Sequence, residues 1–104
     1  MSFDIDRVLT EMAGTIAGAV NDGSGDIKDT VVQLLKSERE TLKDLGDALL
    51  RNEIDDAVFH QEIEREKKVI EAELLTVQLM TKALAERAVN AAIDVFVKAV
   101  KLAV

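Results

Sequence analysis

The chain contains no cysteine, no proline, no tryptophan and no tyrosine, and its only aromatic residues are three phenylalanines. Without cysteine it can form neither disulfides nor thiolate metal sites, and it has no cysteine nucleophile. Nucleic-acid binding normally requires a basic surface or stacking aromatic rings, whereas this chain carries a net charge of −7. We therefore expect no nucleic-acid partner.

Glycine is also restricted, because no glycine or proline occurs in the 58 residues from Asp47 to Val104. Glycine and proline are the usual helix breakers, so their absence predicts an all-α fold. A length of 104 residues corresponds to one domain. All five glycines lie earlier in the chain, at positions 14, 18, 23, 25 and 46.

No segment has the character of a membrane span or a signal peptide. The longest uncharged run, Met12 to Asn21, is well short of the roughly 20 apolar residues that a spanning helix needs. The acidic start of the chain lacks the basic region of a signal peptide. We expect a cytoplasmic protein, for which membrane association is disfavoured.

Apolar residues recur every three or four positions and predict a single all-helical domain over residues 1–104. The expected elements are a helix over about 4–20, a loop over 21–25, a helix over about 26–51, a turn over 52–55 and a helix over about 56–104. Asn52 suits a left-handed position after the second helix, and Asp55 suits the cap of the third.

The residues around this turn carry one family resemblance. Leu49-Leu50, Ile54-Asp55 and Phe59 form a spacing that loosely resembles the tight helix–turn–helix hairpins of small bacterial proteins, including SHOCT-like modules. The resemblance covers the hairpin only and brings no catalytic motif, so no family is assigned.

The predicted last helix is too long and too apolar for a monomer. Of residues 74–104, 21 of 31 are apolar. A helix over 56–104 would extend roughly 73 Å, whereas a domain of this size has a radius of gyration of about 13 Å. We therefore expect an antiparallel hairpin with a very long C-terminal helix, closed into an oligomeric bundle, with a dimer and coiled-coil-like packing favoured. The alternative is a kink near Asn90 that folds this helix back within a monomer.

The expected self-association surface combines small residues of the first helix with the apolar face of the last. Ala13-Gly14 and Ala17-Gly18 place small residues four apart, which allows close helix approach. The candidate interface residues are Gly14, Gly18, Leu74, Val77, Leu84, Ala88, Ala91, Val95 and Leu102. A helical protein partner is a second possibility for the same surface.

Two glutamates, Glu38 and Glu66, fall on apolar stripes and are the main candidates for chemistry. Our preferred interpretation is an ion pair between Glu38 and Lys67 that fixes the helix register. The alternative is a carboxylate metal site of the ferritin-like kind, although no carboxylate lies three residues before His60, as that pattern requires. His60 is the only histidine and is expected to be solvated.

No catalytic motif is present, because the chain has neither a phosphate-binding loop nor a nucleophile elbow. We therefore expect a non-enzymatic, self-associating helical bundle without a cofactor, acting as a scaffold, adaptor or assembly component. One alternative is a small ferritin-like carboxylate metal protein. The other is a protein whose amphipathic C-terminal helix lies on a membrane surface.

Overall fold

The computed structural model describes residues 3–20, 26–77 and 80–103. Most of these residues lie in five α-helices. They are α1 (Ile5–Val20), α2 (Asp26–Lys36), α3 (Arg39–Leu50), α4 (Asp56–Thr76) and α5 (Lys82–Leu102). The predicted all-α class is confirmed, since these ranges hold no strand. The predicted loop 21–25 lies outside the described residues.

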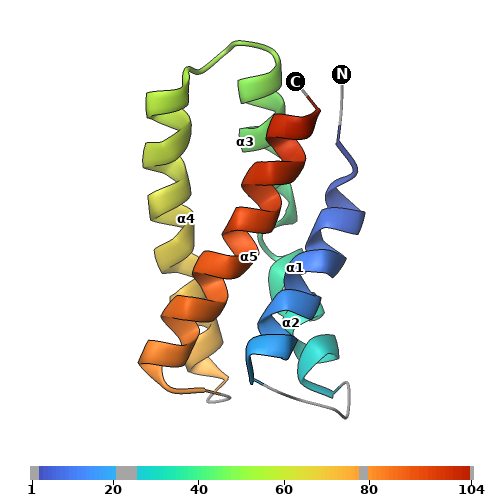
Figure 1. Ribbon diagram of the computed structural model, residues 1–104, viewed down its shortest axis with the longest axis vertical. Helices are drawn as coiled ribbons and strands as arrows, with labels where there is room; N and C mark the ends of the chain where they lie inside the picture. Colours follow the sequence, from blue (N-terminus) through green and yellow to red (C-terminus); the bar gives the residue numbers. More distant parts are fainter. Residues whose placement is uncertain (1–2, 21–25, 78–79, 104) are drawn as a thin grey trace.

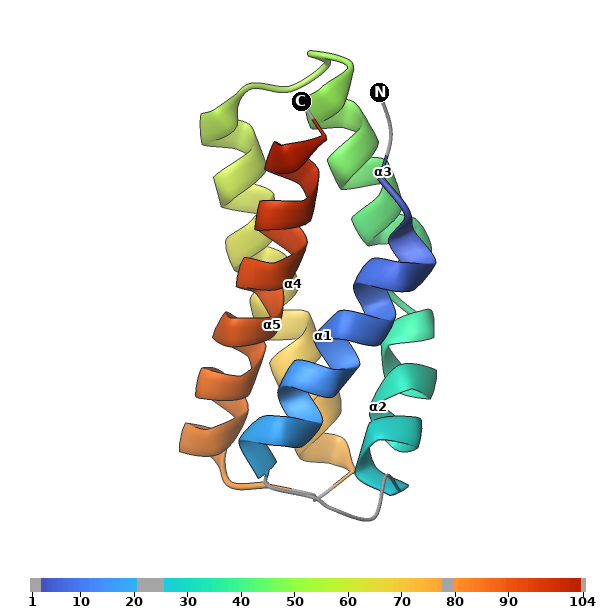
Figure 2. The same cartoon turned by 45° about the vertical axis from the view of Figure 1, so that its right-hand side comes forward.

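The helices form an up-and-down bundle (Figure 1). Helices α2 and α3 lie nearly end to end and together make one column, beside the columns of α1, α4 and α5 (Figure 2). Neighbouring columns run antiparallel, as in four-helix bundles. The radius of gyration is 13.3 Å, and the first and last described residues lie at the same end of the bundle (Figures 1 and 2).

The core is built chiefly on the packing of α1 against α5. Helix α1 buries Ile5, Leu9, Met12 and Ile16 on one stripe, at the three- and four-residue spacing of an amphipathic helix. Helix α5 contributes a matching stripe of Ala85, Ala88, Val89, Ala92, Ile93, Phe96 and Val100. Phe96 also stacks on Phe59 of α4, with ring centroids 6.3 Å apart, so one aromatic cluster joins α4 to α5.

The very long C-terminal helix predicted over 56–104 is wrong. Helix α4 ends at Thr76, and α5 begins at Lys82 and has 21 residues. The Thr81 hydroxyl caps α5 by accepting a hydrogen bond from the Leu84 amide at 3.2 Å. Reversal here lets the apolar face of α5 pack on α1 and α4 of the same chain, so the apolar surplus is largely buried without a partner.

The fold-back alternative placed its break at the wrong residue, because α5 continues through Asn90 without interruption. As in that alternative, the C-terminal helix packs on other helices of the same chain. The break falls instead between Thr76 and Lys82, where no glycine or proline marks it.

The predicted helix over 26–51 is also divided, at Ser37 and Glu38. The Ser37 hydroxyl donates a hydrogen bond to the Leu34 carbonyl oxygen at 2.7 Å, and the Glu38 amide donates to Leu35 at 2.9 Å. Serine hydroxyls that bond back to the preceding turn compete with the helix and bend it. Glu38 thus lies at a junction rather than inside a continuous helix.

The turn between α3 and α4 follows the residues that predicted it. Asn52 has φ 59°, the left-handed conformation that ends a helix at relatively low cost for asparagine. Asp55 caps α4, its Oδ1 accepting from the Val58 amide at 2.9 Å. This turn closes the hairpin of α3 and α4.

Candidate functional site

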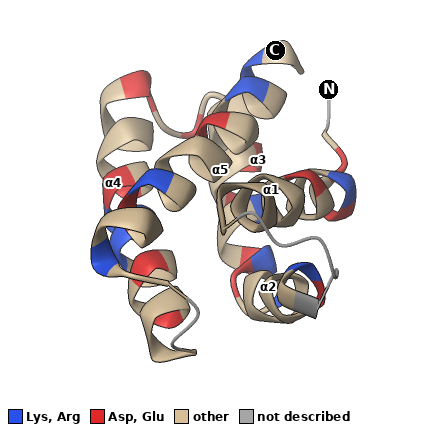
Figure 3. Cartoon of the chain, turned by 60° about the horizontal axis from the view of Figure 1, so that its bottom comes forward, with Lys and Arg blue, Asp and Glu red and all other residues tan. Residues whose placement is uncertain are grey.

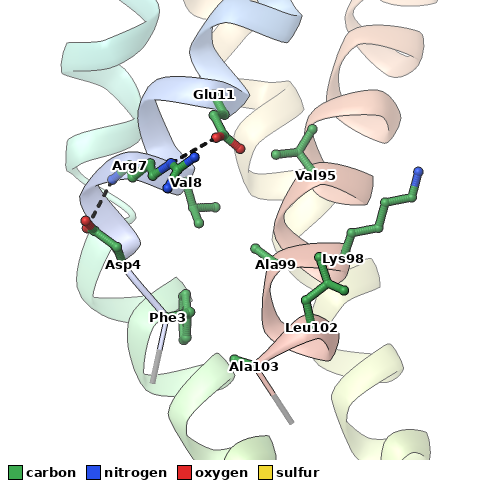
Figure 4. Close-up of a pocket in the computed structure, with 10 residues that line it drawn as sticks. All are labelled: Phe3, Asp4, Arg7, Val8, Glu11, Val95, Lys98, Ala99, Leu102 and Ala103. Carbon is green, nitrogen blue, oxygen red and sulfur yellow. Dashed lines mark hydrogen bonds and ion pairs between the residues drawn. The ribbon is translucent and has the colours of Figure 1, made fainter. Parts of the chain in front are cut away.

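An apolar groove lies between the start of α1 and the end of α5. It has a volume of about 580 Å³. Its lining residues are Phe3, Asp4, Arg7, Val8, Glu11, Val95, Lys98, Ala99, Leu102 and Ala103. We call it the α1–α5 groove. Figure 4 shows Phe3, Val8 and Val95 turned toward the space between the two helices.

Charged groups stand around this apolar floor. On the α1 side, Arg7 lies 3.4 Å from Glu11 and its amide donates to Asp4 at 3.2 Å. On the α5 side, Lys98 points away from α1 (Figure 4). Leu102 is 86% exposed, which makes it the most exposed of the large apolar residues in the described part of the chain.

Phe3 is positioned by a close approach to α3. A Cβ placed on Gly46 would lie only 2.4 Å from two atoms of the Phe3 ring. The same ring meets Phe96 edge-on, with centroids 5.9 Å apart. The missing side chain of Gly46 therefore leaves the space in which Phe3 forms one end of the α1–α5 groove.

A second candidate site is a set of carboxylates where the α2–α3 junction meets α4. Glu66 is 5% exposed and is the only buried polar or charged residue among those described. Glu38 is the group that acts most directly on it, and burial, followed by Glu38, raises the pKa of Glu66 to about 8. The Ser37 hydroxyl lies 3.1 Å from Glu73 Oε2 and 3.3 Å from Glu38 Oε2.

The predicted ion pair between Glu38 and Lys67 is not formed among the described residues. Lys67 Nζ instead lies 3.1 Å from Glu64 Oε1, one turn earlier on α4. Side chains three residues apart on one helix lie close together, so this pair does not depend on the position of a neighbouring helix. The structure therefore brings Glu38 to Glu66 and leaves Lys67 outside the pair.

Within residues 3–20, 26–77 and 80–103, no three or more histidine, aspartate or glutamate side chains are arranged to hold a metal ion. His60 is exposed, with its ring centroid 5.9 Å from that of Phe59. Glu64, one turn further along α4, is paired with Lys67.

The predicted interface residues fall into three groups. Leu74 and Ala88 are fully buried in the chain's own core, so neither is available to a partner. Gly14 and Leu84 are half-buried, and Val95 lines the α1–α5 groove. The exposed members are Gly18, Val77, Ala91 and Leu102. The close packing expected from Gly14 and Gly18 is supplied within the chain by buried Ala13 and Ala17.

Each of the five helices carries both acidic and basic residues (Figure 3). In the described part of the chain, no helix is both long and apolar enough to cross a bilayer.

The described residues thus form an all-helical bundle with an open apolar groove and a buried carboxyl group, that of Glu66. Comparison with protein-family models, curated proteins and solved structures finds no match to the chain. Functional inference therefore rests on the groove and the carboxylates themselves.

Proposed function

We propose that this protein is a non-enzymatic, self-associating helical bundle that serves as a scaffold, adaptor or assembly component. The observation that carries the proposal is the exposed Leu102 side chain beside the apolar α1–α5 groove. An apolar hollow rimmed by charges is a typical association surface. Its proposed occupant is a second copy of this chain.

The shape and charges of the groove support a twofold arrangement. In a twofold dimer, both copies use the same surface. If one residue contacts a second residue of the partner copy, the second residue also contacts the first one of the partner. Leu102 of one copy would enter the groove of the other. Lys98 would then face the acidic α1 side, where Asp4 and Glu11 stand. Opposite charges at such a rim favour one orientation of the two copies.

Sedimentation velocity from micromolar to millimolar concentration tests the proposal. We expect a mass of two chains, each of 11.4 kDa. Leu102→Glu removes two apolar contacts per dimer, so the dissociation constant should rise about 100-fold if each buried leucine contributes about 1.5 kcal/mol. Because Leu102 is so exposed in the single chain, the fold should survive, as circular dichroism would show.

Val69→Glu is the matched control. Val69 is 38% exposed on α4 and is not part of the α1–α5 groove. It introduces the same charge at a distant surface, so we expect it to leave the dimer intact. A monomer throughout the concentration range would refute the proposal. Equal loss of dimer in both variants would refute the assignment to the groove.

A further inference from the structure

Glu66 carries a buried carboxyl group that forms no ion pair with a basic side chain in the described part of the chain. One of its oxygens, Oε1, is buried and receives no hydrogen bond from any donor in the described structure. A buried, unpaired carboxylate is costly, so such a group normally takes up a proton. Whether Glu66 takes up a proton depends on the charges of its neighbours.

The charged groups around Glu66 are all carboxylates. Glu38 faces it from the α2–α3 junction, while Glu62 and Glu73 approach along α4. From α3, Asp44 lines the same shallow groove of about 500 Å³ as Glu62 and Glu66. Helices α1 and α5 bury only apolar residues, so they supply no counter-charge from the core side.

Three basic side chains of α3 and α4, those of Arg39, Lys43 and Lys67, are engaged in ion pairs with other carboxylates. Lys67 lies 3.1 Å from Glu64, and Lys43 lies 2.9 Å from Asp47. Arg39, which follows Glu38 directly, is bound to Asp6 of α1 at 2.8 Å. Because these basic side chains are held in other ion pairs, the simplest group that neutralises Glu66 is a proton.

We propose that Glu66 and Glu38 share one proton, and that this proton makes the docking of the α2–α3 junction on α4 sensitive to pH. The shared proton replaces the repulsion of two carboxylates with a hydrogen bond between them. When the junction separates from α4, both carboxyl groups meet water and the proton is released. Docking therefore weakens as pH rises.

The pKa values of Glu66 and Glu73 are both raised, as docking that weakens with rising pH requires. Burial raises the pKa of Glu66 to about 8, with the hydrogen bond to Glu38 and its charge as the next causes. Burial and the charge of Glu38 also raise the pKa of Glu73, which the Ser37 hydroxyl partly offsets. The junction is thus attached to α4 through groups whose attraction depends on protons.

Hydrogen exchange at the junction amides measures this docking directly. The Glu38 amide donates to the Leu35 carbonyl oxygen, and the Leu42 amide donates to the Glu38 carbonyl oxygen. Exchange of these two amides therefore reports on the junction. After correction for intrinsic exchange, we expect their opening equilibrium to rise at least tenfold between about pH 6 and about pH 8, and to level off above that. A flat wild-type profile would overturn the proposal.

Two variants and one control complete the test. Glu66→Gln keeps a hydrogen-bonding group of the same shape without a titrating proton, so the profile should become flat. Glu38→Gln removes the neighbouring charge, so the rise should be smaller and should end at a lower pH. Glu86→Gln alters an exposed glutamate on α5, away from the junction, and should retain the wild-type profile.

A direct readout does not depend on either variant folding. In the wild-type protein, the ¹³C signal of the Glu66 side-chain carboxyl should titrate well above the ordinary glutamate range near 4.3. A midpoint within the ordinary range, or an unchanged slope in Glu66→Gln, would contradict the shared proton.

Discussion

Replacing Gly46 with alanine should destabilise this protein, although the same change stabilises most helices. Gly46 lies within α3, where alanine is favoured over glycine by about 1 kcal/mol. The new methyl group would meet two atoms of the Phe3 ring at 2.4 Å and Val100 Cγ2 at 3.1 Å. The ring must therefore leave its position against Phe96.

The expected loss follows from these opposing effects. Overpacking of a tight contact costs about 1–3 kcal/mol. After the helix-propensity gain is subtracted, Gly46→Ala should lower the free energy of unfolding by about 1 kcal/mol. In a Phe3→Ala background the obstructing ring is gone, and Val100 needs to shift by only a few tenths of an ångström. There Gly46→Ala should stabilise the protein by up to about 1 kcal/mol.

Urea unfolding of the four proteins in this double-mutant cycle measures the coupling. The two effects differ in sign, so the interaction between positions 3 and 46 should be about 2 kcal/mol. Circular dichroism at 222 nm follows the helices throughout. If Gly46→Ala stabilised the wild-type protein as much as the Phe3→Ala variant, the ring would not occupy the space above Gly46, and the reasoning would fail.

Two further predictions concern a helix cap and pH. Asp55→Ala should lower the free energy of unfolding by about 1 kcal/mol in urea titrations because α4 loses the cap to the Val58 amide, whereas Asp55→Asn keeps an acceptor and most of the stability. Global stability should fall as pH rises from about 4.5 to about 8, because the folded chain keeps the Glu66 proton that the unfolded chain loses. The slope should be at most about 1.4 kcal/mol per pH unit, reduced by solvent screening, and calorimetry of Glu66→Gln should show little of it.

Local features of the fold could be predicted because they depend on neighbouring residues. The left-handed Asn52 and the cap at Asp55 each follow from the conformational and hydrogen-bonding preferences of one side chain. The all-α class follows from the apolar periodicity and the missing breakers. The start of α1 differs from its prediction by one residue.

The two breaks in the longer helices could not be predicted in the same way. Thr81 caps the start of α5, but a single threonine is too weak a local signal to mark a break in the helix by itself. The reversal is stabilised by packing of α5 on α1, which are far apart in the sequence. A serine at position 37 is equally weak as a local signal.

The carboxylate site shows the same division. The apolar stripes correctly indicated that Glu38 and Glu66 face the interior of the bundle. Glu66 is buried and Glu38 is half-buried. Assigning Lys67 to Glu38 required an unbroken helix register through residue 38. The break at Ser37 alters that register, and Glu64 offers Lys67 a closer partner.

The pairing of the first helix with the last has a consequence for synthesis. Helix α1 leaves the ribosome well before α5, which provides its most extensive packing surface. At about 5–20 residues per second, the apolar face of α1 waits several seconds for that surface. During this interval α2 and α3, which also contact α1, can cover part of it. The order of translation therefore leaves part of the apolar face of α1 in water until α5 has been made.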